Sequence, residues 1–131
     1  MGAEPWIAWV PGELDPEKAL KRAQSQVFSL GSFRGAERHP KSIEDAREVA
    51  AEDGTRSVLD VRGISDGEEP GMACGVPVSE LEGLFGSNAP AKDAVVSCIA
   101  LWSEIGRGCA RYVVAYDGER LGILFLGYSY D

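Results

Sequence analysis

The chain has 131 residues, a formal net charge of −8, and hydrophobic and charged shares of 44% and 26%, which are typical of one soluble globular domain spanning residues 1–131. The acidic balance excludes a nucleic-acid-binding protein that works by broad neutralisation of phosphates. No apolar run approaches the roughly 20 residues that a membrane helix needs, so we expect no membrane partner. The N-terminus lacks the basic segment of a secretion signal, which predicts a cytoplasmic protein.

The N-terminal part of the chain predicts one strand and two helices. Residues 6–10 are apolar and aromatic and stop at a Pro-Gly pair, which is typical of a short strand. A helix is expected over residues 15–31, because an Asp-Pro pair opens it and a glycine closes it. A second helix is expected over residues 42–54, opened by an approximate capping box and closed by a glycine.

The centre of the chain predicts a strand followed by a long loop. The strand is expected over residues 56–62, where alternation places Val58, Asp60 and Arg62 on one face. Residues 63–78 are rich in glycine, proline and acids, and we expect them to form a loop. Such a loop is long for a compact domain, and long ordered loops often carry function.

The C-terminal part predicts two helices and a hairpin. A short helix is expected over residues 79–85 from a capping box, and the longest helix over residues 88–105 from apolar residues at helical spacing. Residues 111–131 give the strongest signal, because an Asp-Gly dipeptide suited to a type I′ turn joins two apolar segments. Residues 123–126 are all apolar, as expected for a strand that is covered on both faces.

These elements predict an α+β fold. We expect a small, mainly antiparallel sheet of about four strands packed against three or four helices. The C-terminal hairpin is expected to supply the central strand of that sheet.

No motif in the chain indicates a reaction. One histidine, His39, and three scattered cysteines make no familiar zinc site, so we expect neither a metal nor a cofactor. Cys109 lies between Arg107 and Arg111, whose charges would lower the pKa of its thiol and make it reactive. The main interpretation of Cys109 is nevertheless a small structural residue at a turn, and a reactive thiol is the alternative.

Asp60 is the acid that the predicted strand explains least. On a partly buried face its carboxylate needs a partner, and Arg62, two residues further on, is the nearest candidate. The main interpretation is a structural ion pair, and the alternative is a catalytic acid with a raised pKa.

The charges are unevenly distributed along the chain. Residues 18–47 carry seven basic side chains against three acids, a net charge of +4, whereas residues 60–82 carry six acids against one arginine, a net charge of −5. Such asymmetry steers a charged partner, although solvated loops produce it as well.

Two segments carry a resemblance. Residues 53–61, DGTRSVLDV, and residues 127–131, GYSYD, resemble segments of small bacterial proteins of uncharacterised function. In those proteins a helix leads into a GT-R-S-(V/I)-L-D strand, and the chain ends in GYS-(F/Y)-D. The resemblance implies an intact single domain with a nearly complete C-terminus, and it implies no catalytic residues.

We therefore predict a non-enzymatic partner-binding protein, such as an immunity- or antitoxin-like inhibitor that binds a basic protein through an acidic face. The alternative is a small enzyme or ligand-binding domain with a pocket near Asp60, Arg111 and Tyr128. A homo-oligomer is compatible with either function. The residues expected to bind the partner are Asp60, Asp66, Glu68, Glu69, Tyr128 and Tyr130. The further candidates for a pocket are His39, Arg111 and Cys109.

Overall fold

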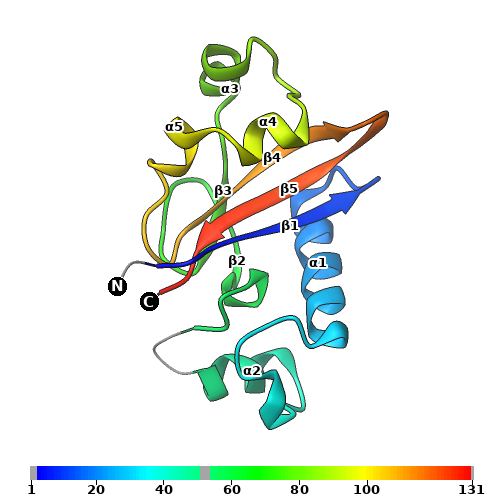
Figure 1. Ribbon diagram of the computed structural model, residues 1–131, viewed down its shortest axis with the longest axis vertical. Coiled ribbons are helices and arrows are strands. Elements are labelled where there is room, and N and C mark those ends of the chain that lie inside the picture. The colour runs from blue at the N-terminus through cyan, green and yellow to red at the C-terminus, as the bar shows by residue number, and fades with distance from the viewer. Residues whose placement is uncertain (1–2, 51–53, 131) are drawn as a thin grey trace.

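The computed structural model describes residues 3–50 and 54–130, and five strands of this part form one mixed sheet in the order β1-β5-β4-β3-β2 (Figure 1). The strands are β1 (Pro5–Pro11), β2 (Gly63–Ser65), β3 (Met72–Gly75), β4 (Ala110–Asp117) and β5 (Arg120–Tyr128). The pairs β1–β5 and β5–β4 are antiparallel, and the pairs β4–β3 and β3–β2 are parallel. The α+β class is confirmed, and the C-terminal hairpin is central as predicted. The sheet is mixed rather than mainly antiparallel, and it has five strands rather than about four.

Helices cover both faces of this sheet (Figure 1). The helical segments are α1 (Pro16–Leu30), η1 (Ala36–Arg38), α2 (Ile43–Ala50), η3 (Val58–Asp60), α3 (Val78–Phe85), α4 (Lys92–Val96) and α5 (Ile99–Trp102). On one face, Leu20 of α1 and Val58 of η3 pack with Phe125 of β5. On the other face, Leu101 of α5 packs with Leu124, the neighbour of Phe125 in the strand. Because successive strand residues point to opposite faces, β5 contributes to both cores.

The apolar run in β5 is buried as the sequence predicts. Each residue from Ile123 to Leu126 has 0% of its surface exposed, because β5 has a strand on either side and helices above and below. The hairpin turn differs by one residue from the expected Asp-Gly pair. Asp117 still pairs with Arg120, so the two-residue loop is Gly118 and Glu119, with Gly118 at φ +64°.

The expected starts of the first two helices are confirmed. Asp15 accepts a hydrogen bond from the Glu17 amide at 3.0 Å and caps α1. The Ser42 hydroxyl accepts from the Asp45 amide at 3.0 Å at the start of α2. α2 is described to Ala50, and residues 51–53 of its expected end lie outside the described residues.

The predicted strand over residues 56–62 is wrong, because its centre forms the 3-10 turn η3. Side chains from two helices satisfy the main-chain carbonyls that a neighbouring strand would otherwise occupy. Gln24 Nε2 donates to the carbonyls of Val58 and Val61, and Arg47 Nε donates to Leu59 O at 2.6 Å. Both donors are far away in sequence, so no local pattern indicated them.

The expected loop over residues 63–78 contains two short strands. β2 and β3 pair in parallel with each other, and β3 pairs in parallel with β4. With three and four residues, they are too short to show a periodic pattern.

The expected long helix over residues 88–105 is two short helices, α4 and α5. Cys98 between them has extended backbone angles, φ −83° and ψ 95°, and its carbonyl accepts from the amides of Leu101 and Trp102. The break turns Ile99 outward, where 83% of its surface is exposed, whereas a continuous helix would align it with the buried Val95. No glycine or proline marks this break in the sequence.

Candidate functional site

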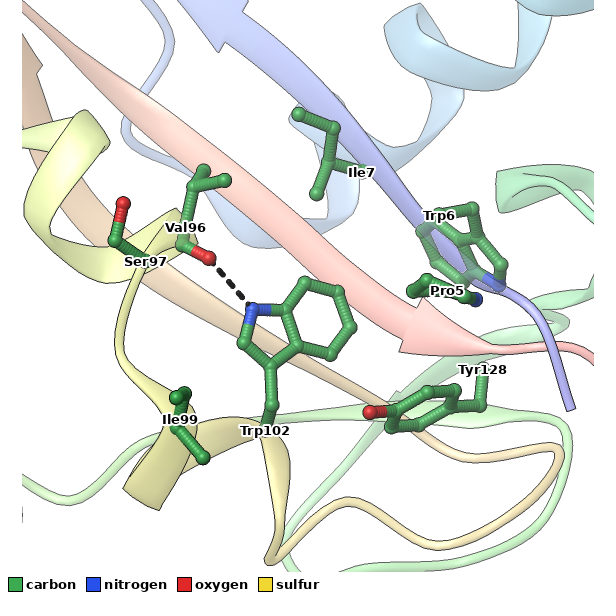
Figure 2. Close-up of a pocket in the computed structure, with 8 residues that line it drawn as sticks. All are labelled: Pro5, Trp6, Ile7, Val96, Ser97, Ile99, Trp102 and Tyr128. Carbon is green, nitrogen blue, oxygen red and sulfur yellow. Dashed lines mark hydrogen bonds between the residues drawn. The ribbon is translucent and has the colours of Figure 1, made fainter. Parts of the chain in front are cut away.

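An apolar groove lies between the edge strand β1 and the two short helices α4 and α5 (Figure 2). It has a volume of about 480 Å³. Ile7 on β1 and Ile99 on α5 line it from opposite sides, with 48% and 83% of their surfaces exposed. Large apolar side chains that gather at an exposed hollow are typical of an interaction site.

Trp102 forms the inner wall of the groove and connects the helices to the sheet. Its indole Nε1 donates to the carbonyl of Val96 at 2.8 Å, which links α5 to the end of α4 (Figure 2). Its ring meets that of Tyr128 edge to face, with centroids 5.2 Å apart. These contacts hold the indole in one orientation, so this wall of the groove is preformed in the free protein.

Among the residues that the structure describes, β1 is an edge strand, and no hydrogen bond to its outer side at Ile7 or Trp9 is found. The amide of Gly12 donates to Leu121 O, and the amide of Ser129 donates to Glu4 O. Even-numbered residues from 4 to 12 therefore face β5 in the antiparallel register, and Ile7 and Trp9 direct their amides and carbonyls to the open edge. Pro5 and Pro11 also face that edge, and neither has an N–H to donate.

A second, polar hollow of about 410 Å³ lies below η3, and Asp60, Glu69 and Tyr130 line it. Asp60 is 7% exposed. Its Oδ1 accepts from the amide and the hydroxyl of Thr55 at 2.7 and 2.8 Å. Its Oδ2 is buried and has no hydrogen-bond partner among the residues that the structure describes.

The environment of Asp60 raises the pKa of its carboxyl group. Burial is the main cause of this rise. Hydrogen bonds from Thr55 and from the Arg56 amide lower the pKa, and so does the positive charge of Arg47. The expected ion pair with Arg62 is not found, because none of the ion pairs between described residues includes Asp60.

Tyr130 reaches the same hollow over a floor of glycines. A Cβ atom on Gly54, Gly71 or Gly108 would lie 3.0 Å or less from the Tyr130 side chain, so the ring rests directly on backbone. Tyr128 lines the apolar groove instead. The two tyrosines separate because β5 ends at Tyr128, and strand alternation ends with it.

The remaining acids predicted to bind a partner differ in their exposure and in their hydrogen-bond partners. Asp66 is exposed, and Glu69 is exposed at the polar hollow. Glu68 accepts from the Gly106 amide at 3.1 Å and lies 3.6 Å from Arg111 Nη2. Glu68 therefore has structural partners, and Arg111 is held beside it.

The predicted pocket residues do not assemble. Asp60 lines the polar hollow, Tyr128 lines the groove, and Arg111 lines neither of these two. His39 is exposed at the end of η1, beside Phe28 and away from both. Cys109 is buried, and burial raises the pKa of its thiol although the charge of Arg111 lowers it.

Sequence reasoning missed Ile7, Ile99 and Trp102 as members of a site. A signal for the edge did exist, since prolines at both ends of a strand indicate an edge position. Nothing local indicated Ile99, because its exposure results from the helix break.

Among residues 3–50 and 54–130, no group of histidine, cysteine, aspartate or glutamate side chains is arranged to hold a metal ion. No helix in this part is long and apolar enough to cross a membrane. No family model, no curated protein and no solved structure matches this chain.

Proposed function

We propose that the protein is a non-enzymatic partner-binding protein, and that its partner lays an extended segment along β1 with apolar side chains in the adjoining groove. The observation that carries this proposal is the coincidence of a free strand edge with exposed apolar side chains on the same face. Ile7 and Trp9 offer amides and carbonyls at that edge, and their side chains point to the α4–α5 side of the sheet.

Strand addition uses main-chain hydrogen bonds for affinity and pockets for alternate side chains for specificity. The prolines at positions 5 and 11 limit the segment that can pair, since neither supplies a donor. A partner segment of about five residues fits between them at one residue per position. Its groove-facing side chains would contact Ile7, Ile99 and Trp102.

The net charge supports a basic partner. Opposite charge speeds encounter at low ionic strength, and contacts made after encounter then set the lifetime of the complex. An immunity- or antitoxin-like inhibitor of a basic enzyme, acting in the cytoplasm, fits these properties. The exposed acids Asp66 and Glu69 contribute to the charge of the surface.

Site-specific photo-cross-linking tests the proposal. A photoreactive phenylalanine at position 99 is expected to cross-link a partner protein from a lysate of the source cells, and the purified partner is expected to bind the unmodified chain. The matched control places the same residue at position 30, because Leu30 is also strongly exposed, at 69%, and lies on α1. Equal cross-linking from both positions would contradict the proposal.

Two variants then measure the contribution of the groove. Ile99→Asn is expected to weaken binding of the purified partner at least tenfold, whereas Leu30→Asn leaves binding unchanged. Both substitutions keep the net charge, so neither changes the electrostatic attraction that speeds association with a basic partner. A concentration-dependent dimer in light scattering that Ile99→Asn abolishes would identify the partner as a second copy of this chain.

A further inference from the structure

We infer that the polar hollow beside η3 is a binding site for an ammonium group, with Asp60 as its acceptor and the Tyr130 ring as one wall. The site is separate from the groove along β1. The site differs from a surface cluster of acids in two respects. Its acceptor, Asp60, is 93% buried, and the Tyr130 ring that forms one wall packs directly on the glycine backbone.

The free oxygen of Asp60 specifies a ligand that donates a hydrogen bond. Oδ1 already accepts from the amide and hydroxyl of Thr55, and the Arg56 amide also acts on the carboxylate, whereas Oδ2 has no hydrogen-bond partner among the described residues. A buried carboxylate oxygen without a donor is unfavourable, and an incoming N–H group removes that cost. The geometry therefore favours a donor over a second acceptor.

The charged side chains that line the hollow are Arg47, Arg62, Asp60 and Glu69, so their formal charges cancel. Arg47 donates to the carbonyls of Leu59 and Val61, and its third nitrogen contacts Glu44 Oε1 at 2.7 Å. All three nitrogens of Arg47 thus have acceptors of their own.

The remaining charged groups of the lining are Arg62, Glu69 and Asp60. No ion pair between described residues joins Arg62 to Asp60, so the negative carboxylate of Asp60 keeps one unused oxygen. An ammonium group matches both that charge and the unused oxygen, and the Tyr130 ring offers it an aromatic surface.

The same ammonium chemistry occurs in a free aliphatic amine and in a lysine side chain of a protein. Titrations with n-butylammonium chloride and with the peptide acetyl-Gly-Lys-Gly-amide distinguish these sources. NMR spectra of the ¹⁵N-labelled chain are expected to show saturable shifts at the amides of Thr55 and Tyr130 with both probes. Tighter binding of the peptide indicates a lysine, and tighter binding of the amine indicates a small molecule.

The neutral analogue 1-butanol has the same alkyl chain and no charge, and it is expected to cause no saturable shift at these amides. Equal shifts with 1-butanol, or none with n-butylammonium up to 100-fold excess, would overturn the inference.

Two variants with the same charge change locate the acceptor. Asp60→Asn keeps an oxygen for Thr55 but replaces Oδ2 by a donor, and it is expected to weaken butylammonium binding more than tenfold. Asp66→Asn removes an exposed acid that does not line the hollow, and it is expected to change binding less than twofold. Equal weakening by both variants would contradict the site.

A measurement on the unmodified chain keeps the test valid if Asp60→Asn does not fold. Nuclear Overhauser effects are expected between the methylene protons of bound butylammonium and the ring protons of Tyr130. Contacts to Trp102 in place of Tyr130 would assign the amine to the apolar groove and overturn the inference.

Discussion

Asp60 illustrates how a buried carboxylate holds a turn together. It fixes the main chain at Thr55 through two hydrogen bonds, and Thr55 and Ser57 share a further bond at 2.8 Å between their hydroxyls. The turn therefore depends on this local network and on the hydrogen bonds from Gln24 and Arg47 to its carbonyls, rather than on a strand ladder. This local network positions both the polar hollow and the carbonyls that Gln24 and Arg47 bind.

Asp60→Ala is expected to destabilise the protein by about 1–3 kcal/mol, because it leaves the buried amide of Thr55 without an acceptor. Asp60→Asn is expected to cost clearly less, since its oxygen can still accept from Thr55. Urea unfolding monitored by circular dichroism measures both. Equal free energies of unfolding for Asp60→Ala and the unmodified chain would show that the network contributes nothing.

The raised pKa of Asp60 makes stability depend on pH in a defined direction. Below pH ~4, the ordinary pKa of an aspartate, the carboxyl is protonated in both states. As the pH rises towards the higher pKa of the folded state, the unfolded chain is ionised first, so the free energy of unfolding falls. Asp60→Asn is expected to remove this part of the fall in unfolding titrations between pH 3.5 and 8.

Glu80 serves as the internal comparison, because its pKa is also raised, mainly by the neighbouring carboxyl of Glu104 and then by burial. Glu80→Gln is expected to remove a separate part of the same decline. A pH profile of Asp60→Asn that superimposes on that of the unmodified chain would contradict the assignment of Asp60.

The glycines under Tyr130 provide a second test at the residue scale. A Cβ atom on Gly108 would lie 2.6 Å from the Tyr130 ring, and Gly108 has a φ of +74°. Gly118 has a similar φ of +64° but open space around it. Both alanine variants carry the backbone strain of a positive φ, about 1 kcal/mol, and Gly108→Ala is expected to cost more because of the clash.

The Gly118→Ala variant isolates the strain, so the difference in melting temperature between the two variants reports the contact with Tyr130. Combining Gly108→Ala with Tyr130→Ala is expected to recover that difference. If the double variant does not recover this difference in melting temperature, the contact with Tyr130 is not the cause of the destabilisation.

Among the elements, β1 shows how sequence and position combine at a sheet edge. Its even-numbered residues pair with β5 and its odd-numbered residues face the open edge. Proline is tolerated at strand positions whose N–H would face solvent, and it is excluded from positions whose N–H donates to the neighbouring strand. Pro5 and Pro11 obey this rule, which also defines a test of the register.

Ile7→Pro is expected to leave the fold largely intact, because the amide of Ile7 faces the open edge. Ala8→Pro is expected to destabilise by about 1–3 kcal/mol or more, because it removes an amide that pairs with β5 and leaves a buried carbonyl unsatisfied. Thermal unfolding of the two adjacent variants makes the comparison. The reverse order of melting temperatures would contradict the described register.

Elements with local signals could be predicted from the sequence, and elements fixed by distant contacts could not. The Asp15 cap of α1 and the apolar run of β5 depend on neighbouring residues and were found. The η3 turn depends on Gln24 and Arg47, which are 34 and 12 residues from the carbonyls they bind. The same reason explains the groove, since Ile99 is exposed only because Cys98 interrupts the helix.

The candidate site was predicted only in part. The residue pattern singled out Asp60 and Tyr130 separately, and the structure brings them to one hollow although 70 residues separate them. The residues expected to share a pocket are divided, since Asp60 lines the polar hollow and Tyr128 lines the apolar groove.

At the scale of the whole molecule, the two sites lie in different parts of a common framework. Helices cover both faces of the sheet, and the central hairpin joins the two cores (Figure 1). The edge at β1 remains open beside the groove, while the residues of the two cores stay buried. This arrangement supports the binding of an extended partner segment without a change of fold.

Amide hydrogen exchange by NMR tests the proposed docking along β1 most directly. In the free chain, the amides of Ile7 and Trp9 are expected to exchange quickly and those of Trp6, Ala8 and Val10 slowly. In the complex with the purified partner, Ile7 and Trp9 are expected to become protected while the other three stay as they were. Unchanged exchange at Ile7 and Trp9 in a saturated complex would contradict the account.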